Sequence, residues 1–111
     1  MYKVLIVDDE SAIRKGLVSC IDWASIGCEV VKCASNGKQA LEFIEKSQPD
    51  IVISDIHMDE MSGIDILKVA SEKYPNIKFI LLTGIYEFNN AYSAIKYNVV
   101  DLVLKPTTSS K

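Results

Sequence analysis

Four short apolar runs, each followed at once by a residue that can bind a metal ion or an anion, constrain this chain more than any other feature. The runs are residues 4–7 before Asp8 and Asp9, residues 51–54 before Asp55, residues 79–82 before Thr83, and residues 102–104 before Lys105. Runs rich in Val, Ile and Leu are typical of parallel strands that helices cover on both faces. Such strands end along one edge of the sheet, where open α/β sheets bind ligands. The pattern therefore predicts that carboxylates, a hydroxyl and an ammonium converge there.

The composition is that of an ordinary globular domain: 111 residues, of which 49% are apolar and 24% charged. No apolar run approaches the ~20 residues needed to cross a bilayer, and the first strand lacks the features of a signal peptide. We therefore expect a cytoplasmic protein with no membrane partner. The net charge of −3 and the lack of a Lys/Arg cluster argue against direct nucleic-acid binding by this segment.

The cysteines do not suggest a disulfide framework or a zinc site. They are Cys20, Cys28 and Cys33, an odd number without metal-ligand spacing. We interpret all three as small buried hydrophobic residues.

Hydrophobic periodicity predicts strands and helices in strict alternation. The expected strands are residues 2–7, 28–33, 51–54, 78–82 and about 100–104, with a helix in each of the four intervals. In the first helix, Ile13, Leu17, Cys20 and Ile21 have the spacing of one buried stripe, and Asp9 or Ser11 can cap its start. The alternation favours a doubly wound five-stranded parallel sheet of the flavodoxin-like kind, with strand order 2-1-3-4-5.

In that strand order, the first and third strands are neighbours, so Asp8, Asp9 and Asp55 would lie close together. Crowded carboxylates repel one another unless a cation joins them. Mg²⁺ is the expected cation because it prefers hard oxygen ligands and commonly bridges a carboxylate to a phosphate. We expect Asp9 and Asp55 as its direct ligands, with Asp8 beside them.

Asp55 is also the best candidate for a nucleophile that forms an aspartyl phosphate. The Thr83 hydroxyl and the Lys105 ammonium, at two further strand ends, are suited to contact phosphoryl oxygens. Taken singly, these acids have ordinary structural interpretations: Asp9 as a helix cap, Asp8 as a solvated loop acid and Asp55 as a turn residue. The combination with Thr83 and Lys105 favours a phosphoryl-transfer site instead.

These residues resemble the receiver domain of two-component response regulators. The matching blocks, in order, are Val7-Asp8-Asp9-Glu10, Asp55-Ile56-His57-Met58 with Met61-Ser62-Gly63, Leu82-Thr83-Gly84, and Leu104-Lys105-Pro106. The resemblance extends from Tyr2 to about Thr107, so we expect a receiver domain at residues 1–107 and a tail or linker at 108–111.

The resemblance implies a phosphorylation-dependent signalling switch. Asp55 would accept a phosphoryl group from a sensor histidine kinase, and Asp8, Asp9, Asp55 and the backbone carbonyl of His57 would serve the Mg²⁺ site. Thr83 and Lys105 would contact the phosphoryl oxygens. Segments 21–27 and 36–41 are similar to receivers that precede an AraC-like DNA-binding output domain, which this chain does not contain.

Three departures from the family pattern bear on this switch. Asp59 replaces the usual Pro, and Leu102 replaces the usual aromatic residue whose ring moves in the family's switch. The chain also has only six residues after Lys105, too few for the family's fifth helix, so this helix is expected to be truncated. The sheet face left exposed favours association of the chain, most simply as a homodimer.

Three other functions fit parts of the pattern. A phosphatase of the haloacid-dehalogenase kind also uses a strand-end Asp, a Thr, a Lys and Mg²⁺, but it needs a second Asp at the position of His57. A flavin or nucleotide module would need a Gly-rich loop where Asp8 and Asp9 stand. A receiver acting without phosphorylation would not need the full residue set. We therefore expect no enzyme beyond self-phosphorylation from small donors and self-dephosphorylation.

Overall fold

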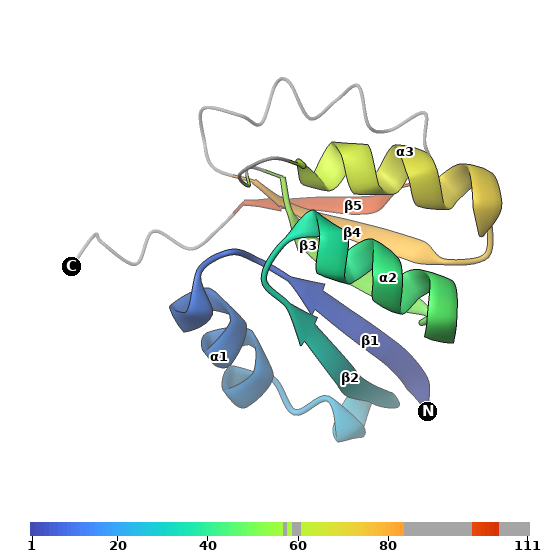
Figure 1. Cartoon of the computed structure of the whole chain (residues 1–111). Coiled ribbons are helices and arrows are strands. Elements are labelled where there is room, and N and C mark those ends of the chain that lie inside the picture. Colours follow the sequence, from blue (N-terminus) through green and yellow to red (C-terminus); the bar gives the residue numbers. More distant parts are fainter. Residues whose placement is uncertain (57, 59–60, 84–98, 105–111) are drawn as a thin grey trace.

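The core of the protein is a five-stranded parallel sheet with strand order β2-β1-β3-β4-β5, as the sequence predicts (Figure 1). The computed structural model describes residues 1–56, 58, 61–83 and 99–104. The strands are β1 (Tyr2–Val7), β2 (Cys28–Ala34), β3 (Ile51–Asp55), β4 (Lys78–Thr83) and β5 (Val99–Leu104). The helices are α1 (Ser11–Cys20), a short 3-10 turn (Ala24–Ile26), α2 (Gly37–Ser47) and α3 (Gly63–Lys73).

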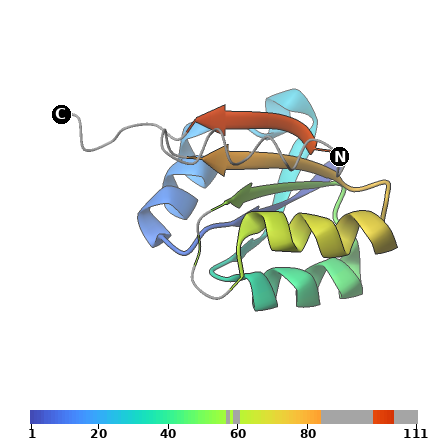
Figure 2. The same ribbon diagram turned by 90° about the horizontal axis from the view of Figure 1, so that it is seen from above.

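Helices cover the sheet from both sides. Side chains alternate along a strand, so Leu5 and Val7 of β1 join one buried cluster, while Val4 and Ile6 join another. The first cluster includes the buried faces of α2 and α3, which lie side by side (Figure 2). Leu17 of α1, partly buried, packs against the second cluster. This two-sided burial is why the strands are apolar without alternation.

Two helix starts are well capped. Asn36 precedes α2, and its side chain accepts a hydrogen bond from the backbone N–H of Gln39 at 2.8 Å. Ser62 and Asp65 form a reciprocal capping box at the start of α3. The two helices begin directly after these caps, at Gly37 and Gly63, and the capping box was not anticipated from the sequence.

The prediction for α1 was partly wrong. The helix begins after Glu10, whose side chain makes no cap, so neither Asp9 nor Ser11 is the capping residue. Cys20 and Ile21 are exposed, because α1 ends at Cys20 and Ile21 continues with extended backbone. The apolar spacing at helical intervals therefore continues beyond the last residue of α1.

The cysteine interpretation holds for Cys28, which is buried, and fails for Cys20 at the exposed end of α1. Cys33 is intermediate, and all three thiols are free. The strand limits differ slightly from expectation: β2, β3 and β4 each run one residue further, and β5 begins one residue earlier. The helix expected around residues 88–95 lies outside the described residues.

Candidate functional site

Two buried aspartates lie at the carboxyl edge of the sheet. Asp8 follows β1 and Asp55 ends β3, and the two strands are neighbours with Val7 opposite Ser54 in the register. Asp8 is 0% exposed and Asp55 is 2% exposed. Carboxylates are seldom buried to this degree without a partner or a task. The register therefore places Asp8 and Asp55 on neighbouring strands at the same edge of the sheet, as the predicted strand order requires.

Asp8, Asp9 and Glu10 form a group of acids that could hold a metal ion. Each offers a carboxylate oxygen, and these oxygens lie within 4.8 Å of one another. Asp9 and Glu10 are exposed, so this group is open to solvent on one side. Among the described residues, Glu10 joins this group, although the sequence analysis placed it only in the matching block after the first strand and gave it no metal-binding role; Asp55 is not one of the group's members.

This donor set fits Mg²⁺. The ion takes carboxylate oxygens, needs only one or two of them, and keeps several waters, which an open rim provides. Close like charges also repel one another, and a divalent cation relieves that repulsion. Asp8 and Asp9 would hold the ion, and Glu10 could do so directly or through water.

The backbone around Asp8 is held by three hydrogen bonds. Its N–H donates to the carbonyl of Ala34 in β2 at 3.1 Å, and its Oδ1 accepts from the N–H of Glu10 at 2.9 Å. Its carbonyl oxygen accepts from Nη1 of Arg14, in the first turn of α1, at 2.6 Å. Sequence analysis missed Arg14, because no motif marks it and its contact with the Asp8 carbonyl depends on the path of the turn.

Asp55 is held just as closely, from its backbone side. The Ser54 hydroxyl donates to the Asp55 carbonyl at 2.9 Å, and the N–H of the next residue, Ile56, donates to Leu82 of β4 at 3.0 Å. Gly63 approaches so near that a Cβ there would overlap the Asp55 carbonyl oxygen. The N–H of Gly63 donates to the Ile56 carbonyl at 2.9 Å. Gly63 is therefore needed for α3 to start directly against the end of β3.

The ordinary structural interpretations of the three aspartates do not fit. Asp9 is not the cap of α1, Asp8 is buried rather than solvated, and Asp55 is the buried last residue of a strand rather than part of a turn. Burial at the end of two adjacent strands therefore needs a different explanation.

The remaining predicted site residues are only partly described. Thr83 is the last residue of β4, beside β3, and it lies opposite Leu104 in the register of β4 with β5. Leu104 ends β5 directly before Lys105. Lys105, His57 and Asp59 lie outside the described residues. Their predicted roles stay predictions.

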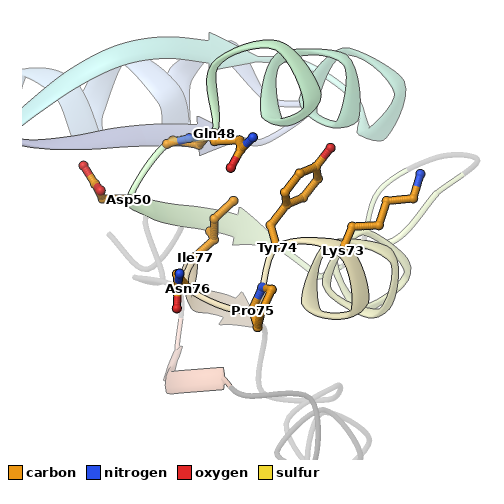
Figure 3. A pocket seen from close by; sticks show the side chains of 8 residues that line it. Gln48, Asp50, Lys73, Tyr74, Pro75, Asn76 and Ile77 are labelled. Carbon is orange, nitrogen blue, oxygen red and sulfur yellow. The ribbon is translucent and has the colours of Figure 1, made fainter.

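A cavity of about 290 Å³ lies away from these acids. It is formed where α2 and α3 end and where β3 and β4 begin, so it is at the opposite edge of the sheet (Figure 3). Its lining includes Gln48, Asp50, Lys73 and Tyr74. Parallel α/β sheets bind ligands at the carboxyl ends of their strands, which favours the acid edge as the functional site.

Comparisons with known proteins identify the family of this chain. The family model described as the response regulator receiver domain matches residues 4–111. The uncharacterized transcriptional regulatory protein YesN of Bacillus subtilis strain 168 is 42% identical over 106 residues, which cover 96% of this chain and 29% of YesN. The chain therefore spans less than a third of that relative.

Solved structures show the same fold. The REC domain of AraT, a response regulator from Geobacillus stearothermophilus, has a TM-score of 0.90 and 43% identity, covering 96% of this chain and 82% of that one. A CheX–CheY–BeF₃–Mg²⁺ complex from Borrelia burgdorferi gives a TM-score of 0.83 at 26% identity, covering 95% and 78%. The chain belongs to the response regulator receiver domain family. In the part of the chain that is described, no helix has the length and apolar character to cross a membrane.

Proposed function

We propose that this receiver domain is a phosphorylation-dependent switch in which Asp55 accepts a phosphoryl group from a sensor histidine kinase. The observation that supports this most directly is the burial of Asp8 and Asp55 at the ends of adjacent strands, beside the exposed acids Asp9 and Glu10. A rigid, buried carboxylate next to a group of metal-binding acids is suited to nucleophilic phosphoryl transfer.

The transfer needs little from the protein beyond position and charge. A carboxylate oxygen of Asp55 would form a bond to phosphorus while the bond from phosphorus to the kinase imidazole nitrogen breaks, and that nitrogen would keep the electron pair. Bound Mg²⁺ would neutralise charge on the phosphoryl oxygens. Ser54 and Gly63 keep the Asp55 backbone fixed, so the carboxylate need not reorganise before it attacks.

The metal ligands are proposed from the resemblance to the receiver family together with the acids at this edge of the sheet. Asp8, Asp9 and Asp55 would supply carboxylate oxygens, and the backbone carbonyl of His57 would supply one more. Support comes from the grouping of Asp8 and Asp9 and from the fold shared with the Borrelia burgdorferi CheX–CheY–BeF₃–Mg²⁺ complex.

Two further residues would contact the transferred group. Thr83 and Lys105 follow on the next two strands, where a hydroxyl and an ammonium could contact phosphoryl oxygens. The register of Thr83 opposite Leu104, the residue before Lys105, supports a shared position for these two. The added charge of about −1.5 to −2 would then favour a second conformation that partners recognise.

The partners are proposed from the relatives. Because YesN is a transcriptional regulatory protein of which this chain covers 29%, we infer a C-terminal DNA-binding output domain, AraC-like in kind, outside the residues printed here. A receiver domain at residues 1–107 in a cytoplasmic regulator would thus pass the signal from a kinase to that domain. Homodimer formation would accompany the switch.

Intact mass spectrometry tests this function. The protein is incubated with Mg²⁺ and acetyl phosphate or phosphoramidate, and one added phosphoryl group is expected. Asp55→Asn should abolish the addition. Asp50→Asn, at the opposite end of β3, is the matched control and should leave it intact. Unmodified wild-type protein, or equal labelling of both variants, would contradict the proposal.

The same sample separates a switch from a phosphatase. A haloacid-dehalogenase-like enzyme would hydrolyse a generic phosphate ester over many turnovers, and Asp55→Asn would stop it. The proposed switch should show no such turnover. A receiver acting without phosphorylation would take up no phosphoryl group from either acetyl phosphate or phosphoramidate.

A further inference from the structure

Arg14 links the first helix to the loop that carries the acids. Its side chain is half-buried, and its Nη1 donates to the Asp8 carbonyl oxygen at 2.6 Å. This distance is short for a hydrogen bond between nitrogen and oxygen, as expected when the donor is charged. The guanidinium therefore lies directly beside the turn from β1 into α1.

Arg14 also closes a ring of hydrogen bonds around that turn. The Asp8 carboxylate accepts from the Glu10 N–H at 2.9 Å, and the Glu10 carbonyl accepts from the Arg14 N–H at 3.2 Å. The Arg14 side chain then returns to the Asp8 carbonyl. The three bonds fix the ends of the Asp8–Glu10 turn relative to each other. Asp9 lies between these two fixed residues.

We propose that Arg14 is a positioning residue that holds Asp8 and Asp9 ready for Mg²⁺. This inference rests on the proposed function, because it assigns a role toward that same site. Groups that orient metal ligands without touching the metal typically change metal affinity 10–100-fold when they are removed. Arg14 acts through the backbone of the turn, not through contact with the ion or with Asp55.

Positioning by Arg14 favours Mg²⁺ binding, whereas its positive charge opposes it. The guanidinium reduces the repulsion between the acids in the metal-free protein, but it also repels a Mg²⁺ ion bound nearby. Screening by water weakens this effect at a half-buried site, whereas the hydrogen bond to Asp8 is local and directed. Positioning should therefore outweigh charge, and loss of Arg14 should weaken Mg²⁺ binding.

Magnesium titration by calorimetry on four proteins tests this. Arg14→Met, which removes the donor and the charge, should raise the Mg²⁺ dissociation constant roughly 10-fold. Arg14→Lys keeps the charge and one donor of similar reach, and it should restore most of the affinity. Lys15→Met is the matched control: Lys15 lines the same groove beside Cys33 as Arg14. It should leave the affinity unchanged or make it slightly tighter.

A second measurement needs neither metal nor phosphate. Hydrogen exchange of the Glu10 amide, followed by NMR without Mg²⁺, should be faster in Arg14→Met than in wild type or Lys15→Met, because the ring is open. Exchange in the core strands should stay the same, which separates loosening of the turn from general destabilisation. If Arg14→Met does not fold, Arg14→Gln replaces it, since glutamine is too short to span the same distance.

The outcomes separate this inference from the proposed function. If Arg14→Met binds Mg²⁺ as well as or better than wild type, or if Glu10 exchange is unchanged, the positioning role is wrong even when Asp55 is phosphorylated normally. If wild type takes up no phosphoryl group but Arg14→Met still weakens Mg²⁺ binding and speeds Glu10 exchange, the proposed function fails and the positioning role stands.

Discussion

Replacing Gly63 by alanine should destabilise the protein, although alanine is the better helix former. A Cβ at this first residue of α3 would overlap the Asp55 carbonyl oxygen and lie 3.0 Å from the Ser54 hydroxyl oxygen and 3.1 Å from the Asp55 carbonyl carbon. Two of these atoms belong to the backbone of a central strand. The helix start must therefore move away from β3.

The size of the effect follows from two opposing contributions. Forcing packed backbone apart costs about 2–3 kcal/mol. The helix preference of alanine over glycine recovers at most about 1 kcal/mol. The net loss in unfolding free energy is therefore about 1–2 kcal/mol, or a fall in melting temperature of roughly 4–8 °C for a chain of this length.

Urea denaturation followed by circular dichroism measures this loss. Gly16→Ala is the matched control, because Gly16 lies within α1 and nothing stands within 4 Å of its added Cβ. That variant should gain about 0.5–1 kcal/mol. If Gly63→Ala is as stable as Gly16→Ala, the argument that close backbone contact fixes Asp55 is refuted. Phosphorylation of Gly63→Ala should also be slower than that of wild type.

Three further substitutions have expected outcomes. Asp8→Asn should reduce Mg²⁺ affinity at least 10-fold, which calorimetry measures. Because it also removes one of three crowded charges, it should raise the unfolding free energy in the absence of Mg²⁺ by about 1 kcal/mol, which urea denaturation measures. Asn36→Ala removes the cap on the Gln39 N–H and should lower stability by about 1 kcal/mol in urea denaturation. Trp23→Phe removes the indole hydrogen bond to the Leu17 carbonyl and should lower the unfolding free energy by about 1 kcal/mol in urea denaturation. An unchanged unfolding free energy would show that this hydrogen bond does not contribute to stability.

The sheet order and the meeting of Asp8 and Asp55 could be predicted because they depend on strand character. Apolar runs without alternation identify buried parallel strands, and the doubly wound order places the first and third side by side. Asp8 and Asp55 each stand directly after one of these apolar runs, so both can be placed at the same edge of the sheet from the sequence.

Features that depend on local geometry could not be predicted in the same way. The spacing of Leu17, Cys20 and Ile21 continues past the point where α1 ends, so periodicity alone could not locate the helix end. Arg14 has no motif, and its contact with Asp8 depends on the path of the turn. The fit of Gly63 against Asp55 likewise depends on where α3 starts.

Chemical trapping of the modified residue tests the central claim most directly. The protein is phosphorylated with acetyl phosphate and Mg²⁺ and then treated with borohydride, which reduces an aspartyl phosphate to homoserine. Peptide mass mapping then locates the change. We expect homoserine at position 55 and nowhere else, and only when Mg²⁺ is present. Reduction at Asp8, Asp9 or Asp50, or no reduction at all, would contradict the account.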